Sequence, residues 1–428
     1  MKRLVSVLMV AALLATSSVA MAEPVKLVFW DMIWGSAGVY DKAGQALVDE
    51  FNQSQSDIQV EYQSVPWDNY YQVFLTAITS GSGPDVATAG SQTPMQFASM
   101  NEIQPLDGLL EKWKSENDPI LDDFLPGFLE TNLLDGKTIA LPWNADTRVF
   151  TYRTDLFEQA GITELPTDWD SLREVLRKLK AAFPDTIPLV SAGDSGGSQN
   201  LMMWLTIANN VGPITEDFKS NMTAPQMREC LEFMASLMDE GLIPEATVSY
   251  KTADADRLFM SGSAAIIYGG PNKLYWSEDT IKDKIAVLDP MKGPSAEKAQ
   301  TVYWANSIAS YTKNHPEEAQ TFIEWWIKHS IKLYTDGQVG KVPVMQSQLE
   351  DPFFSESVLD RALTEKVAPT FVHATFPVKN FYPAFGQING ERYLSAALQE
   401  VLTGRRDFDA ILAEQDANVA GALELQQQ

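Results

Sequence analysis

Residues 139–180 read IALPWNADTRVFTYRTDLFEQAGITELPTDWDSLREVLRKLK, and the order of elements in this stretch is the clearest indication of the fold class. Residues 148–153 alternate in a way that predicts a β-strand. Pro166-Thr167-Asp168-Trp169 then opens an amphipathic helix that we expect to span 168–182. A strand that leads into a covering helix is the building unit of an α/β protein.

The segment before this stretch predicts a parallel sheet. Apolar residues alternate at 25–29 and 58–62, recur at helical spacing over 39–51, and form a third short strand at 85–89. Strands that alternate with helices are typical of βαβ units. Ligands bind beyond the carboxyl ends of such strands, which directs attention to the segments that follow each one.

A second alternation of strands and helices follows. The expected elements are a strand at Ile187–Val190, helices at Ala224–Glu240 and Ala253–Met260, and an apolar strand at Ala264–Tyr268. With 428 residues and 45% hydrophobic content, the chain is long enough for more than one core. We therefore expect the chain to form two lobes.

Tyr152-Arg153-Thr154-Asp155-Leu156-Phe157 resembles the Tyr-Asn-Lys-Asp-Leu-Phe motif of the periplasmic solute-binding proteins of bacterial ABC importers, specifically the extracellular family 1 that takes up sugars. The Pro-Glu-x-Ala helix start at 316–319 and the Gly-x-x-Pro stretch at 340–343 extend the resemblance over most of the chain.

The resemblance implies an α/β, two-lobed periplasmic-binding-protein fold, type II-like. Each lobe would be a mostly parallel sheet flanked by helices, with three hinge crossovers near Ala140, Ile308 and Val342. Both lobes are then discontinuous: residues 23–139 plus 308–340 form the N-terminal lobe, and residues 141–307 plus 342–428 form the C-terminal lobe. The ligand would lie between the lobes, and hinge closure around it would signal occupancy to the permease.

The N-terminus predicts export. Lys2 and Arg3 precede an apolar run, and Ala20-Met21-Ala22 has the pattern of a signal peptidase site, so we expect residues 1–22 to be a signal peptide cleaved after Ala22. The apolar run is too short to span a membrane, and no comparable run follows. Cys230, the sole cysteine, offers no lipid attachment site after the signal and is expected to be a buried thiol. These features predict a periplasmic protein without stable membrane insertion.

Composition excludes several classes of function. The net charge is −25, and cleavage after Ala22 would leave 30 basic against 57 acidic residues, a balance that opposes nucleic acid and anionic lipid. The three histidines lack metal-ligand spacing, no Gly-x-Ser-x-Gly elbow occurs, and the Gly-rich loop at 193–198 lacks the ending of a nucleotide loop. We therefore expect no metal, no cofactor and no catalytic residue.

A sugar site requires flat aromatic rings with polar side chains around them. Several tryptophans directly follow predicted strands and adjoin polar residues. For any single tryptophan, packing within the core remains the alternative. Asp146 and Arg148 lie two apart on one side of an extended segment, where they either share a sugar hydroxyl or pair with each other. The candidate ligand-binding residues are Trp34, Trp67, Asp68, Gln92, Asp146, Arg148, Trp204, Asn272, Trp276, Trp304, Asn306 and Tyr382.

The leading hypothesis is a non-enzymatic receptor that delivers a neutral mono- or oligosaccharide to an ABC permease. A second hypothesis is a receptor for a sugar phosphate, a polyol or another polar metabolite, for which Arg148, Arg153 and Lys273 are the candidate anion contacts. A third, from a different class, is an exported carbohydrate-active enzyme, because a catalytic pair of carboxylates is defined by the fold and is not visible in a sequence.

Overall fold

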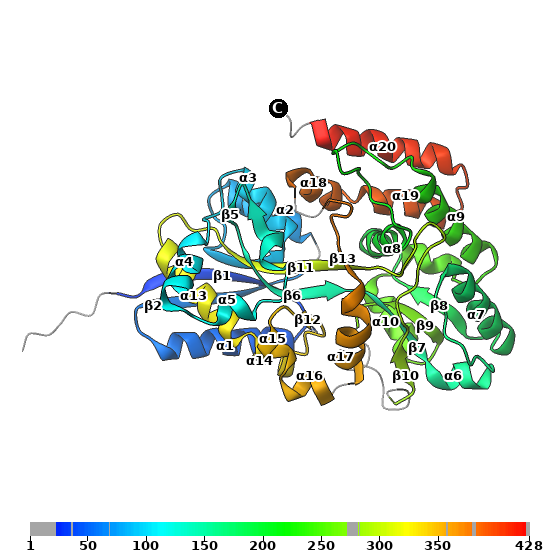
Figure 1. Cartoon of the computed structure of the whole chain (residues 1–428), viewed down its shortest axis with the longest axis horizontal. Coiled ribbons are helices and arrows are strands. Elements are labelled where there is room, and N and C mark those ends of the chain that lie inside the picture. Colours follow the sequence, from blue (N-terminus) through cyan, green and yellow to red (C-terminus); the bar gives the residue numbers. More distant parts are fainter. Residues whose placement is uncertain are drawn as a thin grey trace, which may run out of the picture.

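Two β-sheets, each flanked by helices, organise the chain into two lobes (Figure 1). The computed structural model describes residues 23–424, except 36, 68, 272–280, 282, 357 and 379–381. The larger sheet has the strand order β12-β6-β11-β3-β1-β2, with β13 beside β11, and the smaller sheet has the order β10-β7-β9-β8. The predicted two-lobed α/β fold is confirmed.

The strands of the larger sheet are β1 (Val25–Met32), β2 (Ile58–Val65), β3 (Val86–Gly90), β6 (Leu141–Thr147), β11 (Thr301–Ser310), β12 (Val342–Pro343) and β13 (Phe371–His373). Those of the smaller sheet are β7 (Val149–Arg153), β8 (Ile187–Ser191), β9 (Ala264–Gly269) and β10 (Ile285–Val287), and a separate hairpin pairs β4 (Leu133–Leu134) with β5 (Lys137–Thr138).

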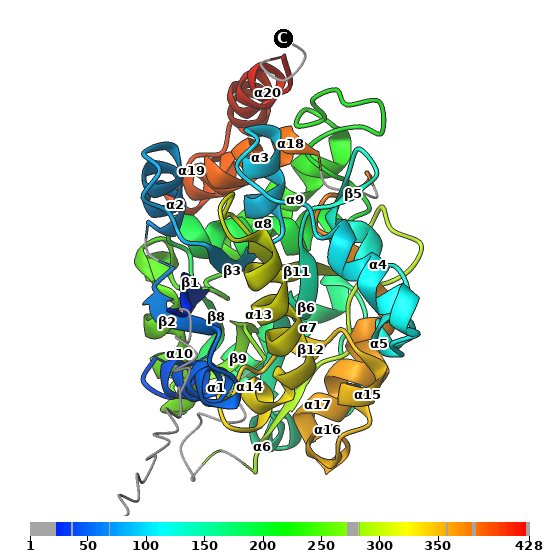
Figure 2. The same ribbon diagram turned by 90° about the vertical axis from the view of Figure 1, so that its left-hand side faces the viewer.

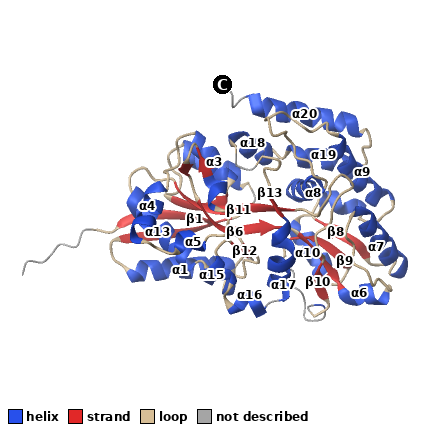
Figure 3. Cartoon of the chain, in the orientation of Figure 1, coloured by secondary structure: helices blue, strands red, loops and turns tan. Residues whose placement is uncertain are grey.

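Helices flank both sheets (Figure 3). Around the larger sheet lie α1 (Tyr40–Ser54), α2 (Tyr70–Thr79), α3 (Gln92–Ser99), α4 (Asp107–Glu116), α5 (Ile120–Asp123), α13 (Pro316–His329), α14 (Ile331–Thr335) and α15 (Gln346–Leu349). The other lobe carries α6 (Thr154–Gln159), α7 (Trp169–Ala182), α8 (Ser195–Ala208), α9 (Pro225–Asp239), α10 (Thr252–Met260), α19 (Tyr393–Leu402) and α20 (Phe408–Glu424). The other α-helices of the described residues are α16 (Pro352–Glu356), α17 (Val358–Ala362) and α18 (Pro383–Gly390), and short 3-10 or π turns lie at Leu129–Asn132, Glu245–Ser249, Leu363–Val367 and Ala368–Thr370.

The core of the first lobe joins early and late parts of the chain. Phe29 on β1 is fully buried, and its ring centroid lies 4.9 Å from that of Phe322 and 4.7 Å from that of Trp326, both on α13. In the turned view, α13 lies between α1 and α4 (Figure 2). Edge-to-face aromatic contacts of this kind add to the stabilisation that burial of apolar surface provides. A segment some 300 residues downstream of β1 therefore completes the lobe that β1 begins.

Both sheets are mixed, whereas the sequence predicts mostly parallel ones. Parallel pairing joins β1 to β2 and β3, β11 to β13, and β8 to β9. Antiparallel pairing joins β11 to β3 and β6, β6 to β12, and β7 to β9 and β10. The reason is topological: β11 returns from the second lobe and so enters the larger sheet in the direction opposite to β3.

The passage from the larger to the smaller sheet occurs at Arg148. This residue alone separates β6, the neighbour of β11 in the larger sheet, from β7 in the smaller sheet. Ile308, where a crossover was predicted, lies inside β11 and pairs with Leu141 on β6. Val342, the third predicted crossover, pairs with Ala145 in the same sheet. The strand pairing thus puts residues 141–147 with β1, β2 and β3.

Candidate ligand-binding site

A row of polar side chains crosses the neighbouring strands β3, β11 and β6 of the larger sheet. Asn306 on β11 is in register with Gly90 on β3 and with Asn144 on β6. The Asn306 Nδ2 donates to Asn144 Oδ1 over 2.7 Å, and both residues are buried. Gln92 lies beside the same row, because a Cβ on Gly90 would come within 2.6 Å of its Nε2. Three amide side chains therefore lie on one face of the sheet, near the carboxyl end of β3.

The buried Nδ2 of Asn144 has no hydrogen-bond partner within the described part of the chain. A buried amide donor without a partner loses the hydrogen bonds that water would give it, and that loss is costly. The polar row therefore contains a buried amide donor that no described protein group satisfies.

An ionic cluster occupies the next position along the same strands. Arg148 Nη1 donates to Asp146 Oδ1 over 2.6 Å, and Lys341 Nζ pairs with the same oxygen. Trp304 is directly opposite Asp146 in register, and the Arg148 guanidinium carbon lies 5.6 Å from the centre of the Trp304 ring. Asp146 and Arg148 thus pair with each other, and a shared contact with a sugar hydroxyl stays a prediction.

Electrostatics keep this cluster ionised. Burial raises the pKa of Asp146, but Arg148 and Lys341 lower it by more, so that the net pKa lies below its usual value. For Arg148, burial lowers the pKa, yet the carboxylate of Asp146 raises it overall. The pair is charged at neutral pH, and Asp146 is shared between the two cations Arg148 and Lys341.

An aromatic group lies beyond β1 and β2. The Trp34 ring contacts Trp67 edge to face at a centroid distance of 4.9 Å and Trp143 at 5.6 Å. Trp67 is 38% exposed and its Nε1 donates to the Ile33 carbonyl over 2.7 Å, whereas Trp34 is only 4% exposed. Trp67 therefore presents an apolar surface to solvent, and Trp34 supports it from behind.

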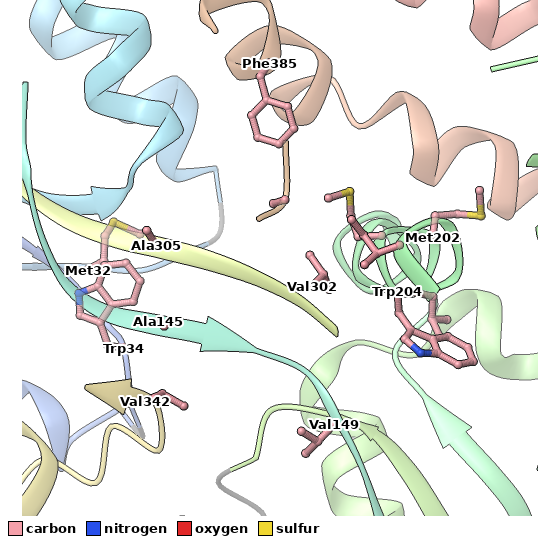
Figure 4. Packing of buried hydrophobic residues seen from close by; sticks show 14 of the residues in the cluster. Met32, Trp34, Ala145, Val149, Met202, Trp204, Val302, Ala305, Val342 and Phe385 are labelled. Carbon is pink, nitrogen blue, oxygen red and sulfur yellow. The ribbon is translucent and has the colours of Figure 1, made fainter. Parts of the chain in front are cut away.

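The structure places the other predicted residues in several ways. Trp304 lies on β11 rather than in a loop, and Trp143 is a buried residue of β6. Trp204 lies on α8 and packs against Phe150 at 4.7 Å, well apart from Trp34, which lies near Met32 and Ala145 (Figure 4). Asp68, Asn272, Lys273 and Trp276 lie outside the described residues.

Trp204 is nevertheless connected to the passage between the sheets. It lines a small cavity together with Arg148 and Thr301.

Tyr382 is buried at the start of α18, where its ring contacts Phe218 at 5.4 Å and Phe385 at 5.7 Å. Both rings, that of Trp204 and that of Tyr382, therefore pack against neighbouring aromatic side chains, and a ligand contact of either ring stays a prediction.

Lys341 and Asn144 are site residues that sequence reasoning missed. Lys341 falls inside the Gly-x-x-Pro stretch and Asn144 inside the stretch 139–180, but neither residue type signals its partner, which comes from the fold. Ser91, a residue next to Gln92, is fully buried and its Oγ donates to the Ala305 carbonyl over 2.7 Å, so it joins strands. Asp85 accepts from the Val28 amide over 2.8 Å, as a scaffold residue does.

Neither a membrane-spanning helix nor a metal-binding cluster occurs among the described residues. Within them, no helix combines the length and the apolar character that crossing a membrane requires. Nor do three or more His, Cys, Asp or Glu side chains gather there in a way that would hold a metal ion. Cys230 is buried, and burial raises the pKa of its thiol.

Comparison with known proteins agrees with this architecture. The sequence model of the bacterial extracellular solute-binding protein family matches residues 36–332. A binding protein of Brucella abortus is 24% identical over 377 residues, which are 87% of this chain and 88% of the relative. The mannitol-binding protein of Pseudomonas aeruginosa is 27% identical over 311 residues, 70% of this chain and 69% of the relative.

A solved structure is similar over almost the whole fold. The crystal structure of a sugar transporter from Arthrobacter chlorophenolicus, with bound laminaribiose, superposes with a TM-score of 0.85 at 28% sequence identity. The match covers 92% of this chain and 99% of the other. These relatives are binding proteins, and the similarity extends across both lobes.

Proposed function

Because the chain belongs to the family of bacterial extracellular solute-binding proteins, we propose that it is the receptor of an ABC importer for a neutral mono- or oligosaccharide. The ligand would bind between the two lobes and be delivered to the transmembrane permease. The laminaribiose-bound relative and the mannitol-binding relative support a ligand rich in hydroxyl groups. Closure of the lobes on the ligand would mark the loaded state, provided that the ligand binds the closed form more tightly.

One observation carries the proposal: the partly exposed Trp67 follows the carboxyl end of β2, and the amide row lies beside the carboxyl end of β3, which is the same end of these parallel strands. The row also holds an amide donor without a described partner. A sugar ring has an apolar face that stacks on an indole and a rim of hydroxyl groups that requires donors and acceptors. Trp67 and Trp304 would supply the plates. The hydroxyl groups of the sugar would contact the polar side chains of Gln92, Asp146, Arg148, Asn306 and Asn144. Trp34 would support Trp67. Trp204 and Tyr382 would form the wall of the second lobe, while Asp68, Asn272 and Trp276 remain proposed contacts.

A polyol is the second candidate ligand, because the mannitol-binding relative is similar over 70% of this chain. A phosphorylated ligand has less support. Arg148 pairs with Asp146, and Arg153 donates to Asp155 from Nε and Nη2 over 2.7 and 2.6 Å. Two of the three candidate anion contacts are therefore already paired with a carboxylate. Retained affinity for a sugar phosphate after neutralising Arg148, Arg153 and Lys273 would remove these residues as its anion contacts.

We also propose refined lobe boundaries and a cellular location. The first crossover is placed at Arg148, the second at the start of β11, where Thr301 leaves the second lobe, and the third beyond Leu349. The last placement is supported by the Ser347 amide, which donates to Asp123 of the first lobe over 2.8 Å. Export to the periplasm with cleavage after Ala22 predicts that the mature protein begins at Glu23, which N-terminal sequencing of the periplasmic fraction tests.

A thermal-shift screen tests the function directly. The mature protein is unfolded and refolded to remove carried-over ligand, then melted with neutral sugars, polyols and sugar phosphates. A ligand that binds only the folded state raises the melting temperature by mass action. We expect a rise with a neutral sugar or a polyol, and recovery of that ligand unchanged after incubation. Release of hydrolysis products from an oligosaccharide would instead support the enzyme hypothesis.

A further inference from the structure

A buried carboxyl group lies beneath the aromatic group of Trp34 and Trp67. Asp31, near the end of β1, is fully buried and accepts hydrogen bonds from three different elements. Tyr40 of α1 donates to Oδ2 over 2.9 Å, and Tyr62 of β2 donates to the same oxygen over 3.2 Å. Thr88 of β3 donates to Oδ1. A carboxylate that accepts from three hydroxyl groups fixes the direction of each donated proton.

Thr88 connects this carboxylate to Trp34. Its Oγ1 accepts from the Met32 amide over 3.0 Å and from Trp34 Nε1 over 3.0 Å, and it donates to Asp31. A hydroxyl has one proton and two lone pairs, so these three bonds use its full capacity. Because the proton points to Asp31, both lone pairs are free for the two N–H groups. The orientation of the Trp34 indole therefore depends, through the Thr88 hydroxyl, on the carboxylate of Asp31.

Trp34 in turn sets the position of the exposed ring. It contacts Trp67 edge to face on one side and the buried Trp143 on the other. Trp67 is otherwise held by its hydrogen bond to Ile33 and by an edge contact with Tyr70 at 5.2 Å. A rotation of Trp34 would remove the support behind the solvent-facing indole.

We infer that Thr88 and Asp31 are positioning residues for sugar recognition, which hold Trp34 so that Trp67 presents a fixed stacking face to an apolar ring surface. This inference rests on the proposed function, because it assigns the ligand face that Trp67 would receive. Neither residue would touch the ligand. A binding face that is held in place before the ligand arrives loses less entropy on binding, and therefore gives higher affinity.

Titration of Asp31 offers a separate readout. Burial is the dominant influence and raises the pKa of Asp31 to about 7, against the lowering effect of the bonds from Thr88, Tyr40 and Tyr62. The other titratable groups near this network are Asp41, which acts on Tyr62, and Tyr334, which acts on Tyr40. A protonated carboxyl must itself donate a hydrogen bond, so one of the three hydroxyl donors has to turn away. The near-ultraviolet circular dichroism of the tryptophans should then change as the pH passes through about 7.

The test compares Thr88→Val, which has the same shape without the hydroxyl, with Thr88→Ser, which keeps it. Thr206→Val is the control, since Thr206 is a buried threonine of α8 whose Oγ1 donates only to the Met203 carbonyl. We expect Thr88→Val to alter the near-ultraviolet spectrum and to weaken laminaribiose binding about tenfold. Thr88→Ser and Thr206→Val should keep both properties. Asp31→Asn should abolish the spectral change near pH 7.

The outcomes separate this inference from the proposed function. If the wild-type protein binds neither laminaribiose nor another sugar, the proposed function fails, and the spectra of the Thr88 variants still decide the positioning role. An unchanged spectrum and unchanged affinity in Thr88→Val would overturn the inference. Should Thr88→Val not fold, Trp34→Phe removes the same Nε1 hydrogen bond and is expected to weaken binding in the same way, and wild-type affinity in that variant would equally overturn it.

Discussion

The guanidinium carbon of Arg148 lies 5.6 Å from the centre of the Trp304 ring, so that the residue between β6 and β7 is held against β11. The same guanidinium donates to Asp146, which is opposite Trp304 in the sheet. A cation over an indole face is stabilising, and more so where water is excluded. This contact fixes the Trp304 ring at the edge where the ligand is proposed to bind.

Replacement of the Trp304 ring should therefore weaken ligand binding. We expect Trp304→Ala to reduce sugar affinity about tenfold or more, and Trp304→Phe to reduce it less, because a smaller aromatic face remains. Titration calorimetry measures both. Trp325→Phe is the matched control, since Trp325 stacks on His329 at 3.7 Å on α13. Equal affinities for Trp304→Ala and the control would remove Trp304 from the site.

Asp146 is expected to matter for stability as well as for binding. Asp146→Asn leaves the charges of Arg148 and Lys341 without their shared carboxylate, and loss of one partner of a buried pair costs about 3 kcal/mol of unfolding free energy. Asp289→Asn is the control, because its pair with Lys366 is about half exposed and should change stability by about 0.5 kcal/mol or less. Urea denaturation compares the two variants, and equal midpoints would contradict the account.

Asp31 predicts an unusual pH dependence of stability. Its folded pKa is raised to about 7 from the ordinary 3.8, so between these values the folded state holds a proton that the unfolded state has lost. The contribution of Asp31 to stability is therefore full below about pH 4 and is lost as the pH rises through about 7. As the pH rises from about 5 to about 8, the melting temperature of the wild type should fall relative to that of Asp31→Asn. A difference that is constant over this range would contradict the prediction.

Asp168 caps helix α7. Its carboxylate accepts from the Ser171 amide over 2.8 Å, and the Ser171 side chain bonds back to the Asp168 amide in a capping box. Asp168→Ala should lower the unfolding free energy by about 1 kcal/mol. Asp170→Ala, an exposed position in the first turn of the same helix, is the control for the loss of charge. An equal effect of the two substitutions would show that the cap contributes nothing beyond charge.

The sequence predicts local elements well where the signal itself is local. Helix α7 was expected at 168–182 and is found at Trp169–Ala182, because the turn residues before it and the apolar face within it lie in one continuous stretch. The strand at Ala264–Tyr268 is likewise confirmed within one residue. The burial of Cys230 follows from the helical spacing of its apolar neighbours.

Relationships across long separations are what the sequence does not contain. Lys341 pairs with Asp146 from 195 residues away, and no local pattern marks that contact. Trp34 and Trp67 both follow strands. Trp34 is nevertheless buried, in contact with Trp143 of β6, whereas Trp67 is partly exposed. The antiparallel course of β11 depends on the lobe from which it returns. The site is thus predicted as a region, and its geometry comes from the fold.

The decisive experiment is a calorimetric titration of the refolded, ligand-free mature protein with laminaribiose, maltose and mannitol, with Trp67→Ala measured in parallel. We expect saturable binding of at least one of these compounds by the wild-type protein, and binding at least about tenfold weaker in Trp67→Ala. Saturable binding that is unchanged in Trp67→Ala would contradict the proposed site. Absence of binding by all three compounds would contradict the claim that this chain is a receptor for neutral sugars or polyols.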